Sequence, residues 1–189
     1  MTSTTTTTTT IPGYIAGTWT LDPVHSDVSF SVRHLMVSKA RGKFTRFEGE
    51  LVTADNPLES SVNATIELDS IDTGDANRDA HLRSADFFDT ANHQTMTYRS
   101  TGVRPAGDGF VVDGELTLHG VTRQVPLQLE LNGFLPESPM GTRTGFSAKG
   151  EISRKDFGIE FNMPLDGGGV VISDKVSLQL EVEAILKQD

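Results

Sequence analysis

The sequence predicts an all-β protein, an eight-stranded antiparallel up-and-down barrel with one short helix. Apolar and polar residues alternate with a period of two in successive segments, which is typical of antiparallel strands with one dry and one wet face. Turn signals separate these segments, and strands do not alternate with helices as they would in a parallel sheet. Because consecutive antiparallel strands leave sheet edges exposed, we expect closure into a barrel that side chains fill or that holds one small ligand.

The expected strands follow one another along the whole chain. Six of them alternate clearly, over residues 28–33, 62–69, 110–118, 127–132, 146–153 and 176–184. Two more, over residues 40–53 and 95–104, are less regular. Phe44 and Phe47 lie three residues apart, which predicts a bulge or bend near Thr45 and Arg46. Turn signals lie at residues 55–57, 106–109, 119–120, 136–141 and 167–169.

Residues 70–89 are the one stretch that does not have the pattern of a strand. Within it, residues 75–88 predict a short helix, because Asp75 can cap its first turn and apolar residues recur at helical spacing. The segment also carries Leu82, Phe87 and Phe88 among charged residues. In a protein of alternating strands, we expect such a segment to cover an opening of the barrel.

Composition restricts the classes of function. The chain has 189 residues and a formal charge of −10. This charge disfavours nucleic acid as a partner, because phosphate binding needs a basic surface, and it disfavours adsorption to anionic lipid. The chain has no cysteine, which excludes disulfides, zinc–thiolate sites and thiol nucleophiles. No apolar run approaches the roughly 18 residues of a membrane span, so we expect a protein that is not membrane-embedded.

The first residues differ from the rest of the chain. We expect a disordered, threonine-rich tail over residues 1–16, because a polar repeat without an apolar face cannot offset the entropy lost on ordering. A single domain then follows over residues 17–189. The start of the chain lacks the basic and apolar regions of a secretory signal, so we expect a cytoplasmic protein.

Several motifs occur in series along the chain, in the segments 19–26, 30–35, 42–44, 70–74, 78–84, 86–89, 114–123 and 154–159. Together they resemble the motifs of the YceI-like polyisoprenoid-binding family, and the resemblance covers roughly residues 17–186. It implies an extended, lipocalin-like barrel with a short helix beside the cavity, a long isoprenoid chain as ligand, and a homodimer. The sequence departs from the family pattern at Gln94, Ser153 and Ser173, which affects loops near the mouth more than the cavity wall.

The strand pattern also predicts which residues contact a ligand. An isoprenoid has almost no hydrogen-bonding capacity, and burying it yields roughly 0.8 kcal/mol per methylene-sized group, so it needs a dry tunnel. Small inner residues (Ala64, Gly114, Ala148 and Gly150) favour a cavity over a filled core, although they also fit barrel taper or strand coiling. The predicted ligand-binding residues are Phe30, Val32, His34, Phe44, Ile66, Leu82, Phe87, Phe88, Leu116, Leu118, Phe146, Leu178 and Leu180.

Two sets of residues are candidates for the polar head group. Residues 33–47 hold five basic side chains and no acidic one, so Arg41 and Arg46 could receive a diphosphate or a quinone head. Arg78 and His81 near the expected helix are the second option. The alternative for the basic run is a solvated strand face. His34 shares the inward parity of its strand, and a hydrogen-bonded core histidine is the alternative for it.

Catalytic and metal-binding motifs are weak. Asp22, His25 and Ser26 have the residue types of a hydrolytic triad but lie together on a turn, and we interpret them as turn and strand-entry residues. The five histidines form no recognised metal motif, so we expect no metal site and no cofactor beyond a bound isoprenoid lipid or quinone. Two alternatives remain: an enzyme that uses His34 or His81 on a lipophilic isoprenoid-like substrate, and a dimeric scaffold with a filled barrel.

Overall fold

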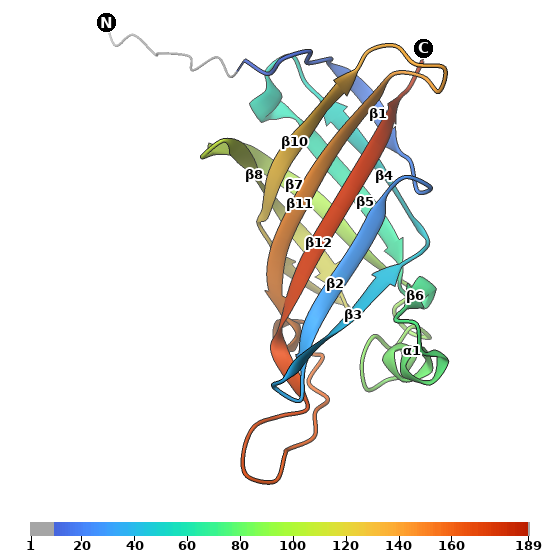
Figure 1. The fold of residues 1–189 in the computed structure, drawn as a ribbon, viewed down its shortest axis with the longest axis vertical. Helices are drawn as coiled ribbons and strands as arrows, with labels where there is room; N and C mark the ends of the chain where they lie inside the picture. The colour runs from blue at the N-terminus through green and yellow to red at the C-terminus, as the bar shows by residue number, and fades with distance from the viewer. Residues whose placement is uncertain (1–9, 189) are drawn as a thin grey trace, which may run out of the picture.

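A closed antiparallel barrel forms the body of the protein (Figure 1). The structure is a computed structural model that describes residues 10–188. Its strands are β1 (Gly17–Leu21), β2 (Asp27–His34), β3 (Ser38–Phe44), β4 (Phe47–Thr53), β5 (Ser61–Glu67), β6 (Ile71–Asp72), β7 (Thr95–Ala106), β8 (Gly109–Leu118), β9 (Val121–Gln124), β10 (Leu127–Leu135), β11 (Arg143–Ser153) and β12 (Ile172–Leu186). The helical elements are η1 (Pro57–Glu59), η2 (Leu68–Ser70), α1 (Ala76–Arg83) and η3 (Arg154–Phe157).

Strand pairing confirms the predicted eight-stranded antiparallel barrel. The order β1-β4-β5-β7-β8-β10-β11-β12 closes on itself, because β12 also pairs with β1. Two strand positions of the barrel are each made of two shorter strands: β1 and β2 share one position, and β3 and β4 share the next. As a result β12 pairs with β1 at one end, where Trp19 lies opposite Leu186, and with β2 at the other, where Phe30 lies opposite Leu178.

The break between β3 and β4 lies at the predicted bend. Thr45 and Arg46 stand between the two strands, and both direct their backbone amides to the Oγ of Ser70, at 3.1 and 3.0 Å. Ser70 is buried and donates in turn to the carbonyl of Glu67 at 2.7 Å. One hydroxyl therefore satisfies the donors that the sheet loses at the bend.

The helix that borders the barrel is shorter than predicted. Asp75 caps α1 as expected, with its carboxylate accepting from the amide of Arg78 at 2.8 Å. The helix ends at Arg83 instead of continuing to residue 88, because Ser84 takes up an extended conformation. The chain then turns back, so that the amide of Phe88 donates to the carbonyl of Leu82. This reversal places the Phe88 ring 5.9 Å from that of Phe44, inside the barrel opening.

Part of the predicted tail is folded. Residues 1–9 lie outside the described residues, but residues 10–16 pack on the barrel. The Tyr14 hydroxyl donates to the carbonyl of Ala54 at 2.7 Å, and its ring meets Phe134 edge-on at 5.2 Å. Ile15 packs against the cluster around Trp19. These contacts hold residues 10–16 against the barrel, so this part of the predicted tail is folded.

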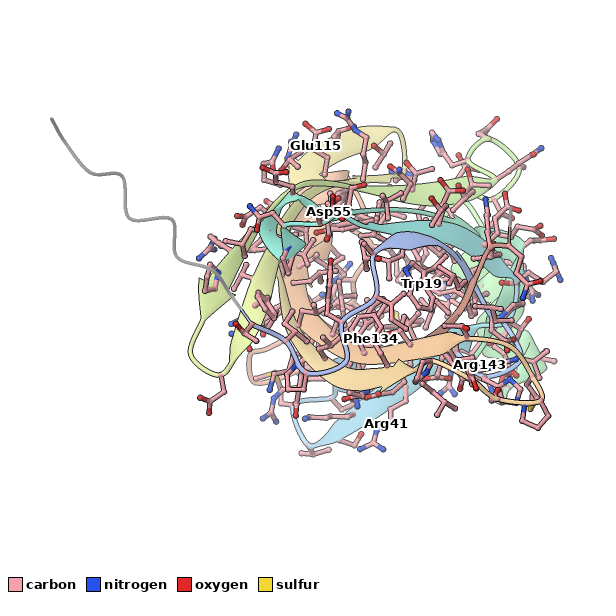
Figure 2. All side chains as sticks on the ribbon, turned by 90° about the horizontal axis from the view of Figure 1, so that it is seen from above. Trp19, Arg41, Asp55, Glu115, Phe134 and Arg143 are labelled. Atoms are coloured by element: carbon pink, nitrogen blue, oxygen red, sulfur yellow. The ribbon has the colours of Figure 1, made fainter. Side chains whose placement is uncertain are left out.

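Aromatic side chains close the end of the barrel that carries both termini. Trp19 is fully buried, donates from Nε1 to the Thr53 hydroxyl at 2.8 Å, and lies 5.7 Å from Phe134. Viewed from this end, both rings lie inside the circle of strands (Figure 2). At the opposite end lie α1 and the loop between η3 and β12 (Figure 1). Among residues 10–188, no helix is long and apolar enough to cross a membrane.

Candidate ligand-binding site

The barrel encloses a cavity of about 410 Å³, within the range of roughly 300–1,000 Å³ that is usual for small-molecule sites. Its wall is almost entirely aliphatic and aromatic. Arg78 and His81 line the cavity from α1, and His34 and the exposed Met163 line it beside the loop before β12. The mouth therefore faces α1 and the loop before β12, away from the termini.

All of the predicted ligand-binding residues line this cavity, whereas their contact with a ligand stays a prediction. They are Phe30, Val32, His34, Phe44, Ile66, Leu82, Phe87, Phe88, Leu116, Leu118, Phe146, Leu178 and Leu180. Strand parity placed most of them correctly, because inward and outward positions alternate along each strand. The cavity also argues against a barrel filled by its own side chains.

The small residues on the inner face have a different role from the one we predicted. A Cβ at Gly114 would collide with the ring of Tyr98, and a Cβ at Gly150 would lie 2.7 Å from Leu127 Cδ2. Tyr98 and Leu127 thus occupy the room that these glycines leave. Of the four small residues, only Ala64 lines the cavity. The space inside the barrel comes from its diameter rather than from missing side chains.

Several lining residues were not predicted. Tyr98 stands on the irregular strand β7, where the alternation is weak. Its hydroxyl donates to the carbonyl of Val125 at 2.9 Å, and burial, together with the charge of Asp113, raises its pKa. Further unpredicted lining residues come from several strands, and a group of them lies on β10, β11, η3 and the loop after η3. The members of this group are Leu127, Leu129, Ile152, Arg154, Ile159, Phe161 and Met163.

Arg154 organises the mouth from within. This buried guanidinium donates to four carbonyls, those of Ile159, Phe161, Ile172 and Ser173, at 2.8–3.3 Å. Burial lowers its pKa, although arginine keeps its charge because its ordinary pKa is above about 12. The side chain fixes both ends of the loop between η3 and β12. The position of Arg154 directly after a strand gave no sequence signal that its side chain would be buried in this role.

A second, smaller cavity of about 80 Å³ lies toward the end with the termini. Tyr14 and Phe134 line it, and it shares Val62, Val112, Leu129 and Phe146 with the main cavity. A layer of shared side chains therefore separates two hollow parts of one barrel interior. The main cavity ends at this layer.

The predicted head-group residues divide into two groups. Arg78 and His81 lie at the mouth, where Arg78 donates to the side chain and carbonyl of Thr73, both at 2.8 Å. Arg41 on β3 is also among the residues that line the cavity, but its side chain is exposed and points away from the barrel (Figure 2). Arg46 is not among the cavity residues, because it sits at the bend and forms an ion pair with Glu67 at 2.6 Å on the outer surface.

His34 and His81 differ in how their rings are held. The Nε2 atom of His81 pairs with Asp86 at 2.8 Å, and its ring meets Phe87 and Phe161 edge-on at 5.0 and 5.1 Å. His34 is half-buried at the end of β2, and within residues 10–188 its ring has no hydrogen-bond partner. His34 is thus the polar group of the mouth that remains available to a ligand.

Asp22, His25 and Ser26 belong to a structural network at the opposite end. Arg143 donates to Asp22 at 2.8 Å and to Glu183 at 2.5 Å, and His25 Nδ1 lies 2.8 Å from Asp22. The hydrogen bond from Arg143, followed by that from His25, holds the pKa of Asp22 well below its usual range. Ser26 exchanges hydrogen bonds with the backbone of Glu183. This arrangement joins the β1–β2 turn to β11 and β12.

Fold and site together define a class of protein: a closed antiparallel barrel with an apolar internal cavity and a sparsely polar mouth. The chain belongs to the YceI-like family, whose domain model matches residues 19–184. It is 41% identical to Protein YceI of Escherichia coli over 162 residues, which are 85% of this chain and 82% of the relative. It is 39% identical to a UPF0312 protein of Staphylococcus epidermidis over 165 residues, 86% of this chain and 94% of the relative.

Solved structures show the same architecture. The YCEI protein of Campylobacter jejuni superposes with a TM-score of 0.70 at 28% identity, covering 94% of this chain and 100% of that one. A polyisoprenoid binding domain from Saccharophagus degradans superposes with a TM-score of 0.66 at 19% identity, covering 92% and 100%. At that identity the second likeness concerns the fold alone.

Proposed function

We propose that the protein binds a long-chain isoprenoid in the barrel cavity without converting it, and so transports, stores or shields that lipid. The observation that carries the proposal is the cavity of about 410 Å³ with an almost wholly apolar wall. Transfer of hydrocarbon from water into such a space is favourable by roughly 0.8 kcal/mol per buried CH₂ group and needs no specific polar contact. The family membership and the Saccharophagus degradans domain support the same ligand class.

Between the two head groups considered, a neutral quinone fits this mouth better than a diphosphate. Arg78 is already bonded to Thr73, and His81 is paired with Asp86. A diphosphate carries several negative charges and is normally held by basic side chains that are free to donate. Within residues 10–188, the unpaired basic side chains of β3, including Arg41, lie on the outer face, whereas His34 lines the cavity and offers a single ring, which suits one carbonyl oxygen.

Native mass spectrometry followed by organic extraction tests the proposal. We expect a co-purifying lipid, and uptake of an added isoprenoid quinone by stripped protein. Ala64→Phe fills the cavity and should abolish uptake, whereas Asn63→Phe changes the exposed neighbour on the same strand and should not. Absence of lipid from the purified protein together with no uptake by the stripped protein would refute the proposal.

An enzyme acting on a lipophilic substrate is the competing function. The available ring of His34 at the mouth is the feature that favours it. Conversion of a bound quinone or isoprenoid ester that is lost in His34→Ala, with binding retained, would establish catalysis. We expect binding without conversion.

Two further properties stay predictions. A homodimer is expected from the resemblance to the family, and light scattering coupled to gel filtration measures its mass. A cytoplasmic location is part of this proposal, and fractionation of the native host tests it.

A further inference from the structure

Asp89, His93 and His119 bring three metal-ligating side chains together outside the cavity. One ligand atom from each lies within 4.8 Å of the other two, and all three residues are half-buried. Asp89 and His93 come from the loop after α1, whereas His119 stands in the turn between β8 and β9. The rings of His93 and His119 are 4.7 Å apart.

Hydrogen bonding leaves the appropriate atoms available. His119 Nδ1 lies 3.0 Å from the carbonyl of Phe157, which can only accept, so the proton is on Nδ1 and the lone pair on Nε2. Such a bond to a backbone carbonyl is how proteins usually orient a metal-binding histidine. The Asp89 carboxylate is positioned by Asn92 at 2.9 Å. Among the residues that the structure describes, the ring of His93 has no hydrogen-bond partner.

We propose that Asp89, His93 and His119 bind a divalent transition-metal ion, with Zn²⁺ as the best match. Two imidazole nitrogens and one carboxylate oxygen are ligands that Zn²⁺ accepts, with a fourth position left for water. Zinc–ligand bonds of about 2.0–2.2 Å place tetrahedral ligand atoms about 3.4 Å apart. The three ligand atoms, which lie within 4.8 Å of one another, would draw together to that separation on binding.

The site would join separate parts of the mouth. Asp89 follows Phe87 and Phe88, which line the cavity, and His119 is held by η3 through Phe157. A bound ion would therefore fix the loop after α1, which follows Phe87 and Phe88, to the β8–β9 turn of the barrel. A second cluster of possible metal ligands in the described residues comprises Asp22, His25 and Glu183. Both of its carboxylates already pair with Arg143, whose positive charge disfavours a bound cation.

Calorimetric titration of the chelator-treated full chain with Zn²⁺ tests the site. We expect one ion per chain, a tetrahedral absorption spectrum with Co²⁺, and affinity reduced by roughly tenfold or more in His93→Gln and Asp89→Asn. His25→Gln is the control and should bind as the wild type does. Circular dichroism verifies folding of each variant. No binding by the wild type, or full binding by His93→Gln, would overturn the proposal.

A separate feature lies at the tip of the β2–β3 hairpin. Leu35, Met36 and Val37 are 41%, 56% and 84% exposed. Leu35 and Met36 have φ values of 51° and 63°, a left-handed conformation that bulky residues rarely adopt and that Asn or Gly would take more easily. The protein thus exposes apolar side chains where local sequence preference favours polar ones.

The outer face of the same hairpin is basic. Arg33, Lys39, Arg41 and Lys43 are exposed, and within residues 10–188 none of them takes part in an ion pair. Arg33 lies directly opposite Lys39 in the sheet, a like-charge pair that is unfavourable. These charges accumulate on a chain of net charge −10. Because salt screens charges beyond about 10 Å, the local basic face, and not the net charge of the chain, determines which charged partners bind here.

The hairpin tip adjoins the mouth of the cavity. The amide of Leu35 donates to the carbonyl of Val171 at 2.8 Å, and Val171 and His34 line the cavity. Met163, which is 53% exposed, also lines the mouth and accepts from the amide of Val171 at 3.1 Å. An apolar tip, a basic face and the entrance of a lipid cavity therefore meet in one region.

We infer that this tip docks on an anionic bilayer, from which the protein exchanges its lipid; the exchange rests on the proposed function, whereas the docking does not. Shallow insertion of Leu35, Met36 and Val37 would bury apolar surface. Each nearby Lys or Arg adds electrostatic attraction to an anionic leaflet. Charge complementarity selects anionic lipid as the partner.

Co-sedimentation with vesicles that lack isoprenoid tests docking independently of cavity binding. We expect adsorption to phosphatidylglycerol-containing vesicles but not to neutral ones, weakened by salt, by Met36→Asp and by Lys39→Glu/Arg41→Glu. Met140→Asp is the matched control, since Met140 is 57% exposed at the opposite end. Equal losses in Met36→Asp and Met140→Asp, no adsorption at all, or tighter binding to nucleic acid or an acidic protein would overturn the inference.

Discussion

The ring of Tyr98 on β7 occupies the space that a side chain at position 114 on β8 would need. Both residues are buried, and the Tyr98 hydroxyl is anchored to the carbonyl of Val125. Tyr98 belongs to the larger of the two hydrophobic core clusters, so this contact holds the barrel wall in place there. It also makes Gly114 a position at which even one methyl group is too many.

Gly114→Ala should lower the free energy of unfolding by about 1–3 kcal/mol, because the added methyl group overpacks the core against Tyr98. Urea denaturation measures the loss. Gly102→Ala on the neighbouring strand is the control, since a Cβ there meets no atom within 4 Å. Equal stability of the two variants would contradict this account of the barrel wall.

Phe146 should set the length of the hydrocarbon that the cavity accepts. It lines both cavities, so Phe146→Ala joins them and shifts binding toward longer isoprenoids. Truncation of phenylalanine in a core costs about 3–5 kcal/mol, so the milder Phe146→Leu is tested alongside. Native mass spectrometry with a series of chain lengths gives the preference. Phe157→Leu, a buried change outside both cavities, should leave it unchanged.

The stabilising effect of Asp22 should disappear in acid. Its pKa in the folded protein lies below its ordinary value, so its ionised form favours folding above about pH 5, and that contribution is lost as the pH falls below about 4 toward the folded pKa. The urea midpoint of the wild type should therefore exceed that of Asp22→Asn at neutral pH and approach it in acid. Asp55→Asn, an exposed turn residue, should show no such difference.

Arg154→Met should loosen the mouth without opening the rest of the barrel. It leaves four carbonyls without their cationic donor, and each hydrogen bond to a charged group contributes about 1.5–3 kcal/mol. Hydrogen exchange should accelerate in residues 158–172, and a bound lipid should dissociate faster. Lys155→Met, on an exposed neighbour, is the control. Unchanged exchange in the loop would show that other contacts hold it.

The sequence predicted the barrel and its inward-facing residues well because strand parity is a local property. Phe30 and Leu178, for example, come from distant strands, yet each is placed on the inner face by its own neighbours alone. The bend at Thr45 was visible for the same reason, as an interruption of the alternation. Local patterns also placed Leu82, Phe87 and Phe88 in the segment of residues 70–89 that was expected to cover the barrel opening.

Features that depend on contacts between distant segments were missed or misjudged. The role of Gly114 depends on the side chain of Tyr98, which a period-two pattern does not reveal. Arg46 has the charge of a head-group residue, but the bend directs it to Glu67. His93 and His119 have no metal-motif spacing and meet only because the loop after α1 reaches the β8–β9 turn. Packing, rather than charge or periodicity, decides each of these cases.

Closure of the barrel has a consequence for biosynthesis. The seam is made by β12, the last barrel strand to leave the ribosome, which must bond to β11 along its length and to both β1 and β2. Until β12 has been synthesised, the earlier strands form a curved sheet with two open edges and an exposed apolar inner surface. Such a sheet is prone to aggregation. A nascent chain of this protein therefore needs its final strand, or a chaperone in its place, to avoid aggregation with other chains.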